Sequence, residues 1–447
     1  MIPIPSHEIR QPSFHADELG FVFVWQGHLL RGIYPQSVDR VKDLFESGLL
    51  PELMDRGLFP KTWISDFENE QFGLIIEHER ITPVTYATEW NFQMLKDAAL
   101  LVLEIVQTAR KYGYDLLDCF KMNVLFRRNK PLYIDLGSFV PARSALFGWH
   151  SFPEFLSSYY YILDIWRSGA PQIAKRMMLP HEEMADPDYW AYKSRLLRTF
   201  PSLLSLHIAV RKKWNGLVNL DDGQIDAYAR RWGSLAGKVL AATRRIATRW
   251  RLAPPLRFRR LERKIRHFQA DMPERAVPEL TVTESVLIDV LNDRWPDCRQ
   301  VTVVNNRAYP LYEALLAQTG VRRVFAINED ELRSREEFLY YRDKDLDVSC
   351  MNFVLSELEV LVRDKFPEAR FASSLVLLPS FTLEERSFRY HNALVLLERL
   401  LLYTTEKTIV MTFKEMDSAL IDTLRNHFTI DLWKKPGGQD TAVILSR

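Results

Sequence analysis

The stretch from Asp115 to Phe139 reads DLLDCFKMNVLFRRNKPLYIDLGSF, and it does most to decide the fold of the first half of this chain. Asp118 is followed five residues later by Asn123, and Asp135 then precedes a Leu-Gly pair. Two carboxylates and one amide therefore stand in a fixed order within a short segment. No other part of the sequence points as directly to chemistry.

The residues around these three side chains predict how the chain delivers them. Apolar side chains at spacings of three and four predict an amphipathic helix over residues 89–112, with Gly113 as its C-terminal cap. Residues 124–126 and 132–134 predict two short strands, with residues 129–131 (Asn-Lys-Pro) as the turn. Together they predict a helix leading into a loop, and a hairpin that returns Asp135 to that loop.

Phosphoryl transfer requires this set of side chains. One carboxylate orients the acceptor hydroxyl, and an amide and a second carboxylate hold Mg²⁺ over the phosphates of ATP. Asp118 is thus the candidate catalytic residue, and Asn123 and Asp135 are the candidate metal ligands, in the order of a kinase-fold catalytic loop. The alternative is structural: Asp118 as a turn residue and Asp135 as the cap of a following turn.

The segment before the helix departs from a kinase small lobe. Residues 20–34 predict two strands joined at Gln26-Gly27, without a glycine-rich loop or a strand lysine. Arg31 and Lys61 are candidate contacts to a phosphate, with a surface charge as the favoured interpretation of each. Glu77 ends a predicted strand over residues 72–77 and is a candidate cofactor contact, with a solvated strand end as the alternative.

Length and composition indicate a globular protein of more than one domain. A chain of 447 residues with 47% apolar and 26% charged residues exceeds one ordinary core. Three cysteines without a CxxC pair fit a reducing compartment. Neither a signal-peptide pattern nor a membrane-spanning apolar run is visible. We therefore expect a cytoplasmic location, with peripheral attachment to the inner membrane face as a variant of it.

Four segments are expected along the chain. Residues 1–19 form a leader, 20–150 the kinase-like lobes, 151–270 a helical extension with basic helices, and 271–447 an α/β domain. In the last segment, strand-like apolar runs alternate with helical patterns, which predicts a parallel sheet. The predicted strands are residues 300–304, 323–327, 374–378 and 408–412.

Residues 230–266 are strongly basic, with 13 lysines and arginines against one acid, Glu262. The apolar stripe within residues 232–250 has the spacing of an ordinary core-facing helix. The arginines are then either solvated or docked on the acidic end of the chain. The other interpretations are an anionic membrane surface or a glycan, while nucleic acid is disfavoured. The basic surface is assigned to Arg244, Arg245, Arg249, Arg259 and Arg260.

Two segments, Thr88–Leu101 and Leu117–Phe139, resemble a bacterial family usually labelled SAM-dependent methyltransferase, similar to nodulation host-specificity methyltransferase-like proteins. That family joins a kinase-like region to a class I methyltransferase fold. The resemblance implies an α+β atypical kinase-like N-terminal domain with a helical extension, followed by an α/β Rossmann-like methyltransferase domain. Asp118, Asn123 and Asp135 match the family's positions, as does Ser138.

The C-terminal segment departs from that family's cofactor motifs. The expected acid after the first strand falls on Val304, the expected glycines fall on Asn306 and Pro310, and the expected ribose-binding acid falls on Asn328. SAM binding in the usual mode is therefore disfavoured. The candidates for a remaining ribose contact are Glu329 and Asp330, with a solvated strand end as the alternative.

Three functions stay open at this point. The first is ATP- and Mg-dependent transfer to a hydroxyl of a glycan or small metabolite, with the methyltransferase-like domain as scaffold. The second is a SAM-dependent methyltransferase with an unusual SAM site. The third is a non-catalytic pseudoenzyme that supports a partner enzyme.

Overall fold

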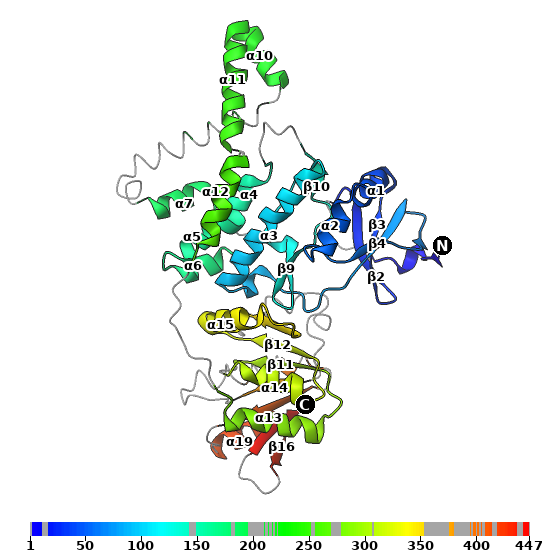
Figure 1. Cartoon of the computed structure of the whole chain (residues 1–447), viewed down its shortest axis with the longest axis vertical. Helices are drawn as coiled ribbons and strands as arrows, with labels where there is room; N and C mark the ends of the chain where they lie inside the picture. Colours follow the sequence, from blue (N-terminus) through cyan, green and yellow to red (C-terminus); the bar gives the residue numbers. More distant parts are fainter. Residues whose placement is uncertain are drawn as a thin grey trace. The chain divides into compact units, whose positions relative to one another are not determined.

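In the computed structural model the chain divides into two compact units (Figure 1). The first unit comprises Met1–Arg80, Lys96–Val124 and Leu132–Ala270. The second comprises Ile81–Leu95, Leu125–Pro131 and Asp271–Arg447, so two short segments of the N-terminal half belong with the C-terminal half.

The structure describes most residues between 2 and 446. The residues left out are 11–16, 143–148, 180–183, 195–209, 252–254, 270–278, 306–307, 353–374, 380–393, 414–417 and 436–440, together with short gaps within 211–221 and 395–406.

A four-stranded antiparallel sheet opens the first unit. Its order is β2-β3-β6-β4, made of β2 (Gly20–Trp25), β3 (His28–Ile33), β6 (Leu74–His78) and β4 (Thr62–Ile64). The predicted hairpin at Gln26-Gly27 is confirmed: both residues have positive φ, 47° and 87°, as a tight two-residue hairpin turn requires. One face buries an aromatic cluster that includes Phe21, Phe23 and Phe72. The short strands β1 (Ile2–Pro3) and β5 (Phe67–Glu68) pair beside it.

Three helices of the first unit are next to glycines. Helices α1 (Val38–Glu46) and α2 (Leu49–Asp55) are separated at Gly48 with φ 89°. Helix α3 (Phe92–Lys111) confirms the long amphipathic helix, and Gly113 with φ 79° follows its end. Its apolar face is buried, which explains why it forms despite several β-branched residues.

The decisive stretch forms two small antiparallel pairs. Strand β7 (Tyr114–Leu116) pairs with β10 (Phe139–Pro141), and β8 (Val124–Arg127) pairs with β9 (Lys130–Tyr133). The turn between β8 and β9 is Arg128-Asn129, with φ 48° and 59°, and Pro131 lies inside β9. The expected turn at residues 129–131 was therefore placed too late, because two left-handed residues close this hairpin.

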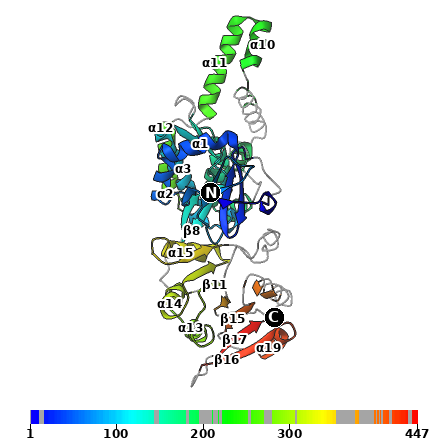
Figure 2. The same ribbon diagram turned by 90° about the vertical axis from the view of Figure 1, so that its right-hand side faces the viewer.

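Helices make up the rest of the described first unit. Figures 1 and 2 both show α10 and α11 side by side as a helical hairpin. The helices are α4 (Phe152–Phe155), α5 (Tyr161–Trp166), α6 (Pro171–Arg176), α7 (Asp186–Lys193), α10 (Asp222–Trp232), α11 (Ser234–Arg251) and α12 (Pro255–Arg266).

A seven-stranded sheet organises the second unit, in the order β13-β12-β11-β14-β15-β17-β16. The first five strands are parallel, and β17 runs antiparallel to both of its neighbours. The parallel strands confirm the Rossmann-like α/β prediction. Their bounds are β11 Gln300–Val304, β12 Arg323–Ile327, β13 Val348–Met351, β14 Leu375–Leu378 and β15 Thr408–Thr412, followed by β16 Thr429–Lys434 and β17 Thr441–Ser446.

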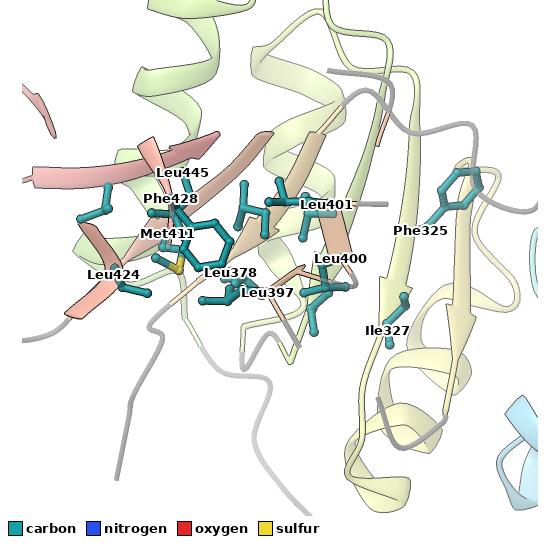
Figure 3. Packing of buried hydrophobic residues seen from close by; sticks show 14 of the residues in the cluster. Phe325, Ile327, Leu378, Leu397, Leu400, Leu401, Met411, Leu424, Phe428 and Leu445 are labelled. Atoms are coloured by element: carbon teal, nitrogen blue, oxygen red, sulfur yellow. The ribbon is translucent and has the colours of Figure 1, made fainter. Parts of the chain in front are cut away.

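Helices cover this sheet, and its five parallel strands are buried on both faces, as parallel strands usually are. Figure 3 shows part of the packing on one face, where Leu378 and Met411 lie among leucines and Phe325 and Ile327 extend from β12 at the other end of the same cluster. The helices whose bounds are described are α13 (Val282–Arg294), α14 (Pro310–Gln318), α15 (Glu331–Tyr341) and α19 (Ser418–Arg425).

Candidate functional site

The carboxyl ends of β11, β12 and β13 form the candidate site of the second unit. Because these strands are parallel, the residues that follow them meet at one edge of the sheet. Strand β11 lies between β12 and β14. The next two strands in the sequence, β12 and β13, lie on one side of it, and β14 and β15 lie on the other. This is a topological switch point, where open α/β sheets bind their ligands.

A reciprocal pair of hydrogen bonds joins the ends of the two central strands. The Asn305 side chain donates from Nδ2 to Glu329 Oε2 at 2.9 Å, and its Oδ1 accepts from the Glu329 backbone N–H at 3.0 Å. Asn305 has φ 53°, a left-handed conformation that asparagine tolerates better than most residues. The pair fixes a partly exposed carboxylate at the sheet edge.

Asn328, which occupies the position of the usual acid, is turned inward. Its Nδ2 lies 3.5 Å from Oε1 of Glu337, which also accepts from the Tyr312 hydroxyl at 2.9 Å. Burial raises the pKa of the Glu337 carboxyl to about 8. An acid at 328 would therefore face a buried carboxyl, and an amide avoids that repulsion.

The two predicted acids after β12 have different surroundings. Asp330 is the N-cap of α15, and its Oδ1 accepts from the Leu332 and Arg333 backbone N–H groups. Glu329 is held by Asn305, and the Asn352 side chain donates to its backbone carbonyl at 3.2 Å. Of these two acids, Asp330 uses its carboxylate to cap a helix, whereas the carboxylate of Glu329 remains at the sheet edge.

Segments from the N-terminal half of the sequence contact this edge within the second unit. The Asn352 backbone N–H donates to the Glu89 carbonyl at 2.7 Å, and the Asn91 side chain donates to Ser334 Oγ at 3.2 Å. Asn129 accepts from the Cys350 backbone N–H at 2.8 Å. The edge of the seven-stranded sheet is thus bordered by residues that precede it by more than two hundred positions in the sequence.

In the first unit, Asp135 is the centre of a hydrogen-bonded turn. Its Oδ1 accepts from the Gly137 backbone N–H at 2.9 Å, and its Oδ2 accepts from the Ser138 hydroxyl. Asn123 Nδ2 lies 3.5 Å from the same oxygen. The structure therefore brings Asn123 and Asp135 together, while their metal-binding role stays a prediction.

Asp118 lies on the loop before them, beside a second acid. Its Oδ1 accepts from the Phe120 backbone N–H at 2.7 Å, and Glu154 accepts from the Cys119 backbone N–H at 2.7 Å. Burial raises the pKa of Glu154 to about 7, and the negative charge of Asp118 acts in the same direction. The two carboxyl groups therefore interact, and the catalytic role of Asp118 stays a prediction.

Arg31 is buried, so its expectation as a surface charge is wrong. It extends from β3, pairs with Asp17, and its Nε has no hydrogen-bond partner among the described residues. Burial lowers the pKa of its guanidinium, and the charge of Asp135 opposes that effect. Arg40 of α1 donates to the backbone carbonyls of Gly137 and Phe139. Two arginines thus surround the Asp135 turn.

The other predicted residues lie apart from these clusters. Glu77 on β6 lies 2.7 Å from His28 Nδ1, on the sheet of the first unit. Arg244 pairs with Asp222, while Arg245 is exposed on α11 and both Arg259 and Arg260 are exposed on α12. Arg249 lies in α11, and its side chain is outside the described part of the structure.

Sequence reasoning missed Asn305, Asn352 and Glu337. The two asparagines directly follow buried strands, which is the signal that would have identified them. Glu337 lies in the charged run ELRSREEF, which predicts a solvated helix. Only the packing of α15 shows that this acid is buried.

No group of three or more His, Cys, Asp or Glu side chains that would suit a metal ion was found in the described ranges. Nor is any described helix long and apolar enough to cross a membrane.

Comparison with known proteins gives one weak sequence relative and a set of structural neighbours. No family model matches the chain. It is 27% identical over 157 residues to the nodulation protein NoeA of Rhizobium meliloti (strain 1021), which covers 34% of this chain and 32% of that protein. The chain therefore matches about a third of the length of this relative.

The solved structures it resembles include methyltransferases. A methyltransferase from Pyrococcus furiosus is 9% identical, with a TM-score of 0.29, over 39% of this chain and 87% of that one. Human methyltransferase-like protein 13, in complex with SAH, is 12% identical, with a TM-score of 0.26, over 37% and 79%. TrmK of M. capricolum, also with SAH, is 6% identical, with a TM-score of 0.24, over 36% and 66%.

These findings correct the expected cofactors. The sequence favoured ATP with Mg²⁺ and disfavoured SAM, and that prediction is wrong: the structural neighbours are methyltransferases, two of them described with the product of SAM. These neighbours cover less than two fifths of the chain, and the kinase-like fold expected for the first half stays a prediction. The fold shown is the Rossmann-like α/β sheet of the second unit.

Proposed function

We propose that the chain is a SAM-dependent methyltransferase whose cofactor binds at the carboxyl ends of β11 and β12. The observation that carries this proposal is the Asn305–Glu329 pair, which holds a carboxylate at the switch point of the sheet. SAM, when bound, supplies a methyl group on a positively charged sulfur. The residues of the chain position and select the adenosyl part.

The side chains at this edge fit the chemistry of an adenosyl ribose. A carboxylate that ends the second strand accepts hydrogen bonds from both ribose hydroxyls. Glu329 supplies that carboxylate one residue later than usual, because Asn328 is turned toward Glu337. Asn305 supports Glu329 from the neighbouring strand, so the acid is oriented before a ligand binds.

The proline in the first loop is compatible with this site. Pro310 is at the first turn of α14, where a backbone N–H has no partner within the helix in any case. Proline at this position therefore removes no N–H that α14 would use for a hydrogen bond within the helix. Val304 is buried at the end of β11, and the polar group at that end comes from Asn305 instead.

Isothermal titration of the full-length chain with SAM and with SAH tests the proposal. We expect both to bind, and Glu329→Gln to weaken binding about 10- to 100-fold, since hydrogen bonds to a charged group contribute about 1.5–3 kcal/mol. Asp343→Asn is the matched control, because it removes one exposed carboxylate from the same unit.

Three outcomes would contradict the proposal in different ways. If neither SAM nor SAH bound, the result would favour a non-catalytic scaffold over a methyltransferase. If Glu329→Gln and the parent chain bound SAM with equal affinity, Glu329 would not be a cofactor contact. An equal loss in Asp343→Asn would show a general effect of charge.

A further inference from the structure

The helical hairpin of α10 and α11 in the first unit exposes apolar side chains. The two helices approach closely at Gly237, where an added Cβ would lie 2.4 Å from Cβ of Ala229. Ile225 is buried in the hairpin. The contact between the helices therefore uses small residues at this point, and three larger apolar residues of α11 remain exposed.

Those larger residues form one stripe along α11. Leu235, Val239 and Ile246 are 75%, 58% and 51% exposed. At 3.6 residues per turn they lie within about 40° of one another around the helix. Trp232, at the end of α10, is 62% exposed. We call the three residues of α11 the apolar stripe.

Cations border the apolar stripe. Lys238 and Arg245 are exposed on α11, roughly 80–100° from the centre of the stripe by helical geometry. Arg230 and Arg231 are exposed beside Trp232, and the Arg231 guanidinium lies 5.3 Å from the centre of the Trp232 ring.

The acids of the hairpin are on the other helix. Asp222 and Asp226 belong to α10, and the carboxylate of Asp222 pairs with Arg244. Between Ser234 and Arg251, helix α11 contains no acidic residue. The exposed face of α11 is therefore apolar along its centre and positively charged at its flank.

We infer that this hairpin docks on the surface of an anionic lipid bilayer, with the apolar stripe buried at the level of the headgroups. A helix that lies on a membrane combines an exposed apolar face containing tryptophan with lysine and arginine along the border of that face. Anionic headgroups complement these cations. Nucleic acid would engage the cations and leave the stripe in water, so the lipid surface accounts for both features.

Co-sedimentation of the full-length chain with vesicles tests the inference. We expect binding to phosphatidylcholine vesicles that contain about 30% phosphatidylserine, and at least tenfold weaker binding to phosphatidylcholine alone. Raising the salt from about 50 mM to about 500 mM should weaken binding to the anionic vesicles.

Two sets of variants separate the contribution of the apolar stripe to vesicle binding from that of the cations beside it. The triple variant Leu235→Gln, Val239→Gln and Ile246→Gln should lower the affinity at least tenfold, and so should the pair Lys238→Gln and Arg245→Gln. The apolar control is Ile173→Gln with Leu179→Gln, also exposed in the first unit. The charge control is Arg322→Gln with Arg425→Gln, which removes the same net charge from the second unit.

Several results would overturn the inference. These are no vesicle binding at low salt, unchanged binding in both test variants, or equal losses in the controls. Binding to duplex DNA that depends on Lys238 and Arg245 but not on the triple variant would identify a nucleic-acid surface instead. Because SAM titration does not involve this hairpin, the inference stands or fails separately from the proposed function.

Discussion

Glu337→Gln is expected to flatten the pH dependence of stability in the second unit. The carboxyl group is completely buried, its Oε1 accepts from the Tyr312 hydroxyl, and its Oε2 has no hydrogen-bond partner among the described residues. Burial disfavours the ionised form and raises the pKa to about 8, since it outweighs the hydrogen bonds from Tyr312 and Asn328 and the positive charge of Arg333. At pH values between the pKa of an exposed glutamate and about 8, the carboxyl of Glu337 is therefore protonated in the folded unit and ionised in the unfolded chain.

The sign and size of the effect follow from proton linkage. Because the pKa in the folded state is above that of an exposed glutamate, the stabilisation from the bound proton is complete at low pH and is lost as the pH rises toward 8. Between about pH 6 and about pH 9 the free energy of unfolding should fall by roughly 3 kcal/mol from this group. For a unit of this size that is about 6–12 °C in Tm.

Thermal unfolding of the parent and the variant at both pH values measures the difference. Hydrogen exchange of the β11 and β12 amides assigns the transition to the second unit. Glutamine keeps an oxygen for Tyr312 and cannot ionise, so any cost of its amide is the same at both pH values. Asp297→Asn is the control, since that carboxylate is 97% exposed. An equal fall in stability for parent and Glu337→Gln would refute the reasoning.

Two further substitutions test the packing around the sites. Asp330→Ala should cost about 1 kcal/mol of stability, because it removes the oxygen that caps the Leu332 and Arg333 amides, and SAM affinity should change much less than in Glu329→Gln; a larger loss of SAM affinity than in Glu329→Gln would contradict this assignment. Gly32→Ala should cost about 1–3 kcal/mol in denaturant unfolding, because the new methyl group would lie 2.4 Å from the Phe72 ring; an unchanged midpoint would show that the ring moves freely.

The strands of the second unit were the most predictable part of the fold. Residues 300–304, 323–327 and 408–412 have the predicted bounds, because central parallel strands are short apolar runs whose ends are marked by polar residues. Helix α3 was predictable for a similar reason, since its long apolar periodicity outweighs local preferences.

In the basic segment, the hydrophobic spacing of the sequence did not predict whether the apolar face is buried. Residues 232–250 have the spacing of a core-facing helix, yet Gly233, with φ 95°, separates α10 from α11, and the stripe on α11 is exposed. Hydrophobic spacing reports that one face of a helix is apolar. It does not report which surface, if any, covers that face.

The sequence by itself determined the Rossmann-like sheet, the Asp118–Asn123–Asp135 order and the loss of an acid at Asn328, since each depends on neighbours along the chain. Only the tertiary structure shows that Asn305 orients Glu329. It alone also shows that Glu337, an acid in the highly charged helix α15, is buried next to Asn328. These contacts join separate strands and helices. Burial and charge depend on that three-dimensional packing, because the desolvation of a carboxyl group is set by everything that surrounds it.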